Sequence, residues 1–396
     1  MIIQNNLHKD NVLLADRHEF IDSVHQLPCF SIVNEVEDLA CFDDPELQSW
    51  ITLNNFIVFG TGGSSLCGQS LEALSENSKS ITFVSNLDPT LLEKIFSEID
   101  PYTTGFLFIS KSGETLETIV QLILLMQKIT PQKNADNFIR SRFVVITENK
   151  KSSLREIALK NNMICLDHPK DIGGRFSAFS IVGMLPAALM GIDPRRIRNG
   201  GKNILTNGLD AAKIGASFVA RNATVGASQH VAFFYSDKLI TFGEWLAQLY
   251  AESTGKSGHG ITQLTARGAV AQHSQLQLYL DGPNDKCFTF FYERQNNSIS
   301  LEERFIPPSF DYLKNKKITN IFEAQHDATI SCIKKKTIEV REIKIDKLTP
   351  EILGEMFMHF MLEVTYVCEI FGINPFDQPS VEEGKIITRN LLAGLL

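Results

Sequence analysis

The stretch FLFISKSGETLET, residues 106–118, contains the junction that decides the fold of this chain. Residues 106–109 form a short apolar run typical of a buried strand, and the polar residues SKSG follow it. From Glu114 onward, apolar residues recur at helical spacing. The sequence therefore predicts a strand that leads directly into the N-terminus of a helix, which is the basic unit of an α/β protein.

The turn between this strand and this helix is a candidate phosphate site. The first N–H groups of a helix have no intrahelical acceptor and the helix dipole is positive there, so hydroxyls beside a lysine can bind a phosphate dianion. The alternative is an ordinary N-cap, in which Ser112 and Thr115 only start the helix. The crowding of suitable side chains favours the phosphate hypothesis, with Ser110, Lys111, Ser112 and Thr115 as ligands.

A second junction of the same kind lies earlier in the chain. Residues 56–59 predict a buried strand, Gly60-Thr61-Gly62-Gly63 a glycine turn, and residues 64–74 the start of a helix. Glycines let a backbone come close to a ligand, and Ser64 would lie at the helix N-terminus. Such turns occur in Rossmann-like proteins with quite different ligands, so this one identifies no ligand by itself.

The spacing of the other apolar runs extends this pattern along the chain. In the first half we expect strands over 81–84, 143–146 and 163–166, and a second unit should contain strands over 230–235, 287–291 and 336–343. Helices are expected between them, including 239–250, the long amphipathic segment 350–371 and a short helix from Val381. This alternation predicts α/β domains with parallel sheets flanked by helices, plus a C-terminal helical segment. Ligands should gather at the carboxyl ends of the strands.

We expect three parts: an N-terminal segment with the first domain (1–165), a second domain (166–345), and C-terminal helices that complete the active site (346–396). Residues 1–50 have a mixed, helical pattern and carry no usable motif.

Composition narrows the class of protein. The net charge of −8 and the pI near 5.7 argue against a nucleic-acid partner. Seven scattered cysteines without a C-x-x-C pair, and an N-terminus that turns polar within a few residues, predict a cytoplasmic protein without disulfides. The charge-free run 176–192 is too short for a membrane span and predicts a buried helix instead. No H-x-x-x-H or H-E-x-x-H spacing occurs, so neither a metal nor another cofactor is expected.

Two charged residues next to apolar helices are candidates for chemistry. Arg175 follows two glycines at the start of the charge-free run, where it opposes the helix dipole, and this favours an anion-binding role over simple capping. Glu252 lies at the end of an apolar helix, where the dipole disfavours the charged carboxylate, as suits a proton carrier. The alternative, that Glu252 simply pairs with Lys256, is equally compatible with the sequence.

Histidine assignments remain open on composition alone. His273 is expected to open a helix with Leu276 and Leu280 on its own face, and a lone histidine in such a place is more often a core residue than a catalyst. His259, which is flanked by glycines, is an equal candidate.

Taken together, these segments resemble the glucose-6-phosphate isomerase family, which is built from two sugar-isomerase domains, from about residue 55 to the C-terminus. Two motifs are specific to that family: GGR followed by an aromatic residue and Ser (173–177), and F-D-Q-x-x-V-E-x-x-K (376–385). The resemblance implies the interconversion of glucose 6-phosphate and fructose 6-phosphate through an enediolate, without a metal. It also implies a homodimer in which His273 reaches the active site of the other subunit. Alternatives are an isomerase that also accepts mannose 6-phosphate, or a non-catalytic sugar-phosphate-binding module of a regulator.

The resemblance also assigns roles to residues. Arg175 matches the arginine that stabilises the enediolate, Glu252 the base that carries the proton, and His273 the ring-opening histidine. The phosphate would be held by the 110–115 turn together with Gly63 and Ser64. Gln378 and Lys385 match other residues that line the sugar.

Overall fold

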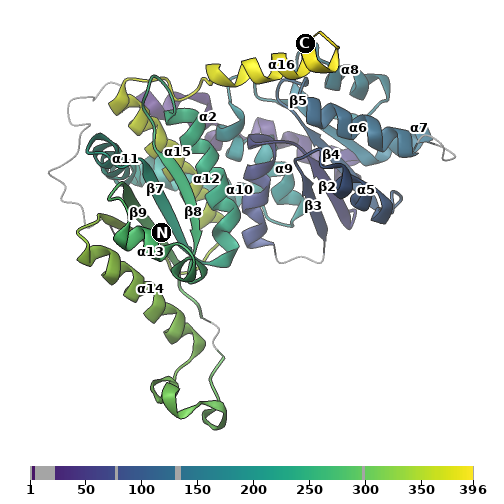
Figure 1. The fold of residues 1–396 in the computed structure, drawn as a ribbon. Coiled ribbons are helices and arrows are strands. Elements are labelled where there is room, and N and C mark those ends of the chain that lie inside the picture. Colours follow the sequence, from purple (N-terminus) through teal and green to yellow (C-terminus); the bar gives the residue numbers. More distant parts are fainter. Residues whose placement is uncertain (1, 5–22, 76–78, 130–134, 297–298, 396) are drawn as a thin grey trace.

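The computed structural model describes residues 2–4, 23–75, 79–129, 135–296 and 299–395, and these contain two five-stranded sheets with helices packed on both faces (Figure 1). The predicted fold class is therefore confirmed.

The first sheet has the strand order β3-β2-β4-β5-β6, and all neighbouring strands are parallel. Every strand that the sequence predicts for this region is present. The central strand β4 is buried along its whole length, as expected when helices cover both faces. The strands are β2 (Asn55–Phe59), β3 (Ser80–Val84), β4 (Thr104–Ile109), β5 (Phe143–Glu148) and β6 (Ile164–His168).

Two hydrophobic clusters cover the faces of this sheet. One face packs against helices that follow its own strands, namely α5 (Pro89–Glu98), α6 (Leu116–Ile129), α7 (Ala135–Arg142) and α8 (Ser153–Lys160). The other face packs against α3 (Pro45–Ile51) and α9 (Ile181–Leu189). The apolar run 176–192 is therefore internal, in part as a 3-10 helix, η6 (Gly174–Phe179), followed by α9. No helix in the described part of the chain has the length and apolarity needed to cross a membrane.

The second sheet has the order β1-β10-β9-β7-β8, in which only the β1 pair is antiparallel. The sequence predicts three of these strands, and it misses the edge strands β1 and β8. The predicted start of β10 at Lys336 is wrong, because α14 (Ile318–Lys335) runs up to that point and Thr337 then adopts a positive φ of 59°. The strands are β1 (Ile2–Gln4), β7 (Gln229–Tyr235), β8 (Thr262–Arg267), β9 (Lys286–Glu293) and β10 (Val340–Ile345).

The long helix α15 (Pro350–Phe371) forms as predicted, and it belongs to the core. Its side chains are buried from Leu353 to Cys368, where α10 (Pro194–Asn207), α11 (Leu209–Thr224) and α12 (Ile240–Thr254) surround it. Of the two roles that its apolar residues allow, core or interface, the core role is therefore correct. The same hydrophobic cluster reaches α4 (Gly63–Ser70) and η6, so it joins the two sheets.

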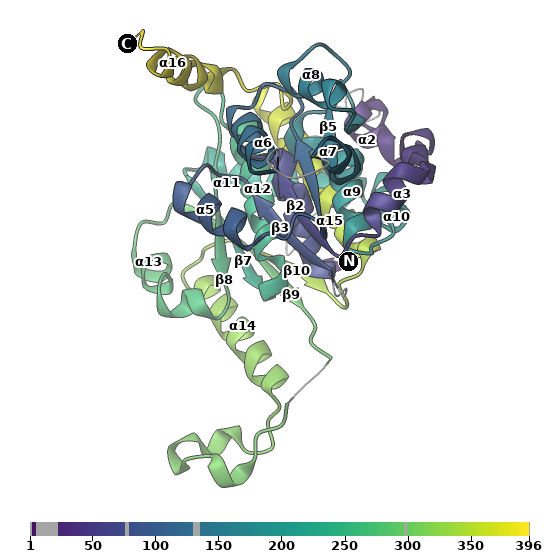
Figure 2. The ribbon, with the colours of Figure 1, turned by 90° about the vertical axis from the view of Figure 1, so that its right-hand side faces the viewer.

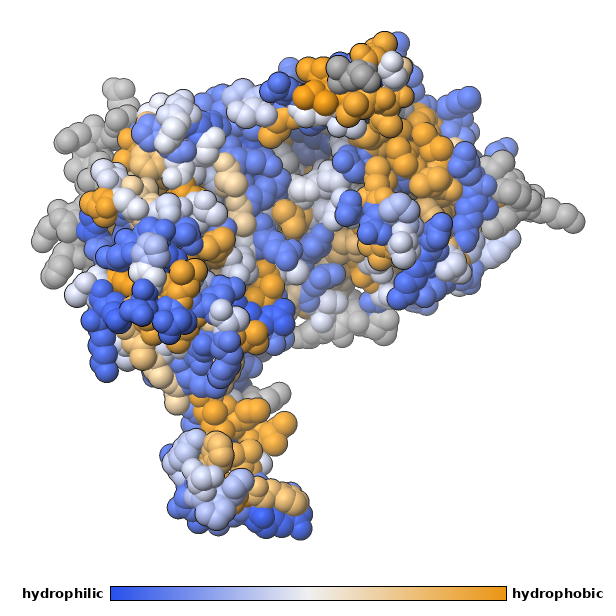
Figure 3. All heavy atoms as spheres, in the orientation of Figure 1, coloured by the Kyte–Doolittle hydropathy of each residue, from blue (hydrophilic) through white to orange (hydrophobic). Residues whose placement is uncertain are grey.

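Two segments project from the body of the molecule (Figures 1 and 2). One is residues 299–317, which come just before α14 in the chain and carry η9 (Glu303–Phe305) and η10 (Pro308–Leu313). The other is α16 (Glu382–Leu392), a helix without a buried residue that lies along one edge of the molecule. Both expose large apolar or aromatic side chains, namely Ile299, Phe305, Tyr312, Ile386, Leu391 and Leu392. Orange atoms gather on both segments in Figure 3.

A buried ion pair ties the second sheet to the helices packed on it. Arg341 of β10 donates from Nη1 to Glu363 Oε2 at 2.5 Å and from Nη2 to Oε1 at 3.1 Å, and both side chains are fully buried. Tyr250 of α12 donates a hydrogen bond to the same carboxylate, and His359 Nε2 lies 3.1 Å from it. Glu363 therefore joins one strand and two helices.

We expect Glu363→Gln to lower the free energy of unfolding by about 3 kcal/mol, because the buried Arg341 charge would lose its counter-ion. Urea denaturation at pH 7 measures this loss. Glu46→Gln is the matched control, since Glu46 pairs with Arg140 at the surface, where both side chains are more than half exposed, and little change is expected.

The pH dependence of this loss has a defined sign. Burial alone raises the pKa of Glu363, but the charge of Arg341 and the hydrogen bond of His359 lower it far below its usual range. A carboxyl with a lower pKa in the folded state stabilises above its unfolded pKa, about 4.3, and this contribution declines as the pH falls below it. The stability gap between wild type and Glu363→Gln should narrow from pH 7 to pH 3, and a constant gap would contradict this assignment.

Candidate active site

The β4–α6 turn is folded as a ring of hydroxyl groups. Ser110, at the end of β4, is buried, and its Oγ lies 2.8 Å from Thr115 Oγ1 and 3.5 Å from Ser112 Oγ. The Gly113 N–H donates to Ser110 Oγ at 3.1 Å, and the Glu114 N–H donates to Ser112 Oγ at 3.1 Å. Helix α6 starts at Leu116, slightly later than predicted, so the hydroxyls lie just before its N-terminus. The four predicted ligands of this turn thus lie in one loop at the carboxyl end of the sheet.

The lysine of this turn faces an acidic side chain. Lys111 Nζ lies 3.5 Å from Oε1 of Glu148, the last residue of β5, and Lys150 forms an ion pair with the other oxygen. The side chain of Lys111 remains about one-third exposed, at 32%. The turn therefore carries a partly exposed positive charge.

The β2–α4 turn connects this loop to the second half of the site. Gly62 has a positive φ of 54°, and a Cβ atom on Gly63 would lie only 2.1 Å from the carbonyl carbon of Gly174. Only glycine lets the N-terminus of α4 approach the segment that carries Arg175 so closely. Ser64 follows directly, next to Gly60. The predicted residue Gly63 thus packs against the segment of Arg175, and Gly60 of the same turn lies near the carbonyl of Ile109, the last residue of β4.

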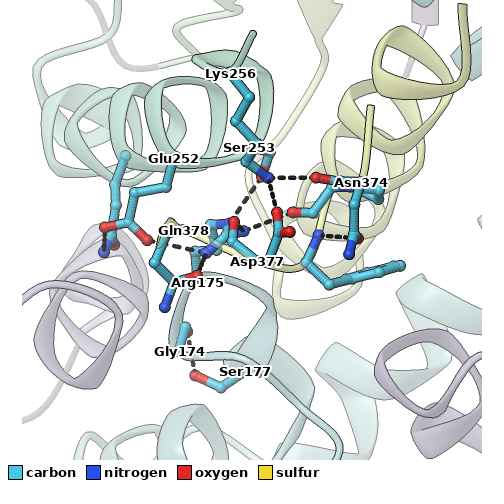
Figure 4. Close-up of polar contacts among 12 residues, drawn as sticks. Gly174, Arg175, Ser177, Glu252, Ser253, Lys256, Asn374, Asp377 and Gln378 are labelled. Carbon is cyan, nitrogen blue, oxygen red and sulfur yellow. Dashed lines mark hydrogen bonds and ion pairs between the residues drawn. The ribbon is translucent and has the colours of Figure 1, made fainter. Parts of the chain in front are cut away.

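Arg175 is the centre of a polar cluster that joins three distant segments (Figure 4). Its side chain is 1% exposed, and all five of its N–H donors have acceptors. Nε donates to Ser253 Oγ at 2.8 Å. Nη2 donates to the backbone carbonyls of Pro375 at 2.6 Å and Asp377 at 3.1 Å. Nη1 donates to Glu252 Oε2 at 3.0 Å and to Gln378 Oε1 at 2.7 Å.

The environment of Arg175 sets its charge and orientation. Burial lowers the pKa of the guanidinium, while Glu252 opposes this effect, and an arginine remains protonated throughout the physiological range. Its backbone is also fixed, because Trp245 Nε1 donates to the Arg175 carbonyl at 3.2 Å. The cation is therefore held rigidly beside the Glu252 carboxylate.

Glu252 lies near the end of α12, and each of its carboxylate oxygens accepts a hydrogen bond from a different donor. Oε2 accepts from Arg175, and Oε1 accepts from Gln248 Nε2 at 2.9 Å. The side chain is 32% exposed, so it remains open on one side. The alternative pairing of Glu252 with Lys256 is wrong: Lys256 Nζ lies 2.8 Å from Asp377 Oδ1 and donates to the Asn374 carbonyl.

The turn 374–378 is thus attached to α12 as well as to Arg175. The hydrogen bond and charge of Lys256 lower the pKa of Asp377, which keeps this contact ionic. Gln378 comes at the end of this turn, as the family motif implies. The ring of Phe376 packs 5.1 Å from that of Phe176, next to Arg175 in the chain.

Two predicted residues do not join this cluster. His273 ends η8 (Val270–His273) rather than opening a helix, and it is exposed, so its expected place on an apolar helix face is wrong. Lys385 lies on the projecting helix α16 and pairs with Glu382 at 2.7 Å. The other histidine candidate, His259, stacks on Phe371 with the ring centroids 5.0 Å apart.

Sequence reasoning missed two side chains of the cluster, Gln248 and Ser253. Gln248 lies one helical turn before Glu252 and on the same face, so an i, i+4 search from Glu252 would have found it. Its Oε1 is buried and has no hydrogen-bond partner among the described residues. Ser253 and the carbonyls of 375 and 377 have no signal in the sequence, because only the tertiary fold brings them to Arg175.

The arrangement combines a carboxylate that can carry a proton, a fixed cation that can hold an oxyanion, and a hydroxyl-rich loop at the carboxyl end of β4. Among the described residues, no group of three His, Cys, Asp or Glu side chains is placed to hold a metal ion.

Comparison with known proteins identifies the family. A family model described as phosphoglucose isomerase matches residues 46–395. A probable glucose-6-phosphate isomerase of Methanococcus maripaludis is 32% identical over 86% of this chain and 79% of its own length. A glucose-6-phosphate isomerase of Thermus thermophilus is 30% identical over 88% of this chain and 86% of its own length.

A solved structure agrees with this result. The crystal structure of a hypothetical protein from Thermus thermophilus superimposes with a TM-score of 0.81 and 26% identity, and the match covers 99% of this chain and 100% of that one. Because the family model spans most of the sequence, and these relatives align over most of their length, the chain belongs to the phosphoglucose isomerase family and is an isomerase.

Proposed function

We propose that this isomerase interconverts glucose 6-phosphate and fructose 6-phosphate by moving one proton between C2 and C1. The observation that carries the proposal is the contact between Arg175 and Glu252, a fixed cation against a partly open carboxylate. The names of the relatives, both glucose-6-phosphate isomerases, support this pair of substrates.

The chemistry follows from these two groups. After the sugar ring opens, the Glu252 carboxylate takes the proton from C2, and the electron pair of that C–H bond passes into the enediolate. The same carboxyl group then returns the proton to C1, and the O2 hydroxyl proton passes to O1, which gives the ketose with a C2 carbonyl and a C1 hydroxyl. Because C2 is oxidised while C1 is reduced within the same molecule, no external oxidant or reductant is consumed.

Arg175 would stabilise the negative enediolate oxygen. Its Nε and Nη2 donors are fixed on the Ser253 hydroxyl and on backbone carbonyls, whereas Nη1 donates to the side chains of Glu252 and Gln378. Side chains can rearrange more easily than backbone, so Nη1 is the part of the guanidinium that an oxyanion can reach. A preorganised donor of this kind stabilises charge as it develops.

The hydroxyl loop 110–115, with Ser64, would hold the phosphate at the other end of the sugar. It lies at the N-terminus of α6, where backbone N–H groups and the helix dipole favour an anion. The β2–α4 turn supports this role, because Gly63 packs against Gly174 and Arg175 while Gly60 lies near Ile109, the residue before the loop. A non-catalytic sugar-phosphate module would need this loop alone and would have no use for the Arg175–Glu252 pair.

We further propose a homodimer in which His273 completes the site of the other subunit. In one chain His273 is exposed and lies outside the cluster, and the segments that project from the body expose apolar side chains. A cavity of about 660 Å³ connects these features, since Gln272 and Leu276 line it together with Phe310 and Tyr312 of the projecting segment 299–317. A second copy covering this region would bury that surface and surround His273.

A cytoplasmic location is also part of the proposal. All seven cysteines are unpaired, as expected in a reducing compartment. Assays with glucose 6-phosphate and mannose 6-phosphate as alternative substrates determine whether the enzyme accepts both epimers.

The first test concerns the base. Glu252→Gln keeps the shape and one hydrogen-bond acceptor but cannot take a proton, so kcat should fall by at least about a thousandfold while 6-phosphogluconate still binds. Glu244→Gln, an exposed carboxylate on the same helix, is the control and should keep normal turnover. If Glu252→Gln retained near-normal kcat, the base would have to be another residue.

A second test concerns the phosphate loop. Ser112→Glu places a negative charge beside the proposed phosphate, so KM for fructose 6-phosphate should rise about tenfold or more. Ser141→Glu, at an exposed position on α7, adds the same charge elsewhere in the domain and should leave KM unchanged. Equal KM values for the two variants would place the phosphate elsewhere.

The third test asks whether the site is shared. Glu252→Gln and His273→Ala chains should each be inactive alone, but a mixed dimer would have one doubly defective site and one normal site. Random mixing makes about half of the dimers mixed, so about a quarter of wild-type activity should return. The two variants are refolded together and the mixed dimers are confirmed by mass spectrometry. Confirmed mixed dimers without recovered activity would show that each site is built from one chain.

A further inference from the structure

The mechanism above leaves one buried acidic side chain beside the phosphate loop without a role. Glu148 ends β5, next to the β4 end that carries the loop, and its side chain is only 9% exposed. One oxygen faces Lys111 Nζ at 3.5 Å, and the other contacts Lys150. A carboxylate here repels a phosphate and also occupies the lysine that the phosphate would use.

The Glu148 side chain is not needed to hold the strand end. The backbone of Glu148 is fixed on its own, because its N–H donates to the Lys111 carbonyl at 3.2 Å. Its carbonyl accepts from the Lys150 N–H at 2.7 Å and from Arg155 Nη1 at 3.2 Å. A structural role for the carboxylate is therefore limited to its two lysine contacts.

The charges around the loop can be counted. Burial raises the pKa of Glu148, but the hydrogen bond and charge of Lys150 and the charge of Lys111 lower it more, so Glu148 is ionised at neutral pH. The neighbouring His168, paired with Glu148 in the β5–β6 register, is neutral, because burial lowers its pKa to about 4. Arg155 is balanced by Asp167 at 2.6 Å. The count thus sets Lys111 and Lys150 against two carboxylates, Glu148 and Glu114 of the loop itself, which accepts from the Ser153 N–H and hydroxyl.

We propose that Glu148 sets the phosphate affinity of this site by competing with the substrate for Lys111. In the free protein Glu148 is the ion-pair partner of the Lys111 ammonium. When a phosphate dianion enters, Lys111 exchanges Glu148 for the phosphate, and Lys150 remains as the counter-ion of Glu148. The carboxylate thereby keeps binding of the phosphate group weak enough for the phosphorylated product to leave. This inference rests on the proposed function, since it takes residues 110–115 as the phosphate site.

Removing the competing charge tests the inference. In Glu148→Gln, the dissociation constant of 6-phosphogluconate, measured by calorimetry, should fall about three- to tenfold. KM for fructose 6-phosphate should fall by a similar factor without a rise in kcat, and the affinity should depend more steeply on salt. Glu148→Asp, which retains the charge, should restore affinity toward the wild-type value.

Removing Lys150, the second partner of Glu148, should change the affinity for 6-phosphogluconate in the opposite direction. Lys150→Gln removes the second partner of Glu148, so Glu148 should hold Lys111 more firmly and 6-phosphogluconate should bind about threefold more weakly. Lys150 is 53% exposed, so this variant should fold even if Glu148→Gln does not. Glu156→Gln is the matched control, because it removes an exposed carboxylate whose partner is Lys151, and affinity should not change.

Two outcomes would overturn the inference. One is unchanged or weaker binding in Glu148→Gln with a normal melting temperature, which would make Glu148 structural or a positioning group for Lys111. The other is unchanged or tighter binding in Lys150→Gln. Failure of the proposed function has a different signature: wild-type protein would not bind 6-phosphogluconate, or Ser112→Glu would bind it as tightly as wild type.

Discussion

The buried guanidinium of Arg175 is the interaction on which the rest of the site depends. A cation that is removed from water is costly unless every donor finds an acceptor, and here all five do. These acceptors come from the end of α12 and from the turn 374–378, segments far from residue 175 in the sequence. Loss of either would leave several of the buried N–H donors without acceptors, so the stability of the fold and the geometry of the site are coupled.

A second buried arginine holds the opposite side of the same helix. Arg341 and Glu363 form an ion pair. Tyr250 of α12, which lies two residues before Glu252, donates a hydrogen bond to Glu363. Successive contacts also tie α12 to α15, since Cys368 Sγ donates to the Ser253 carbonyl at 3.3 Å. Helix α12 is thus attached on one side to the second sheet and on the other to Arg175. This double attachment explains how a side chain near a helix end, where helices commonly fray, can keep one orientation.

The sequence predicts the parts of the fold that depend on local pattern. Strands β2, β4, β5 and β9 consist largely of apolar residues, and a run of this kind predicts a strand without knowledge of its neighbours. The edge strand β8 has the sequence TQLTAR, with polar residues at most positions, so nothing in it marks a strand until β7 is beside it. The same distinction applies to the pairing of Glu252. Lys256 is one helical turn away and is the natural local partner, but the tertiary fold brings Arg175 to Glu252 and the turn 374–378 to Lys256.

The two parts of the site differ in the same way: the hydroxyl loop can be predicted from local sequence, and the Arg175–Glu252 pair depends on the tertiary fold. The hydroxyl loop is contiguous, from Ser110 to Thr115, and all the phosphate ligands proposed for it can be named from one turn of the chain. The Arg175–Glu252 pair requires two segments to meet, and Gly63 must lack a side chain for α4 to pack against Gly174. Since the loop follows β4 of the first sheet and Glu252 lies on α12, which packs on the second sheet, the separation between a phosphate at the loop and the reacting carbons would be set by the packing of the two sheets rather than by flexible side chains. A substitution that adds bulk at Gly63 should therefore disturb the proton-transfer geometry more than it disturbs the phosphate loop.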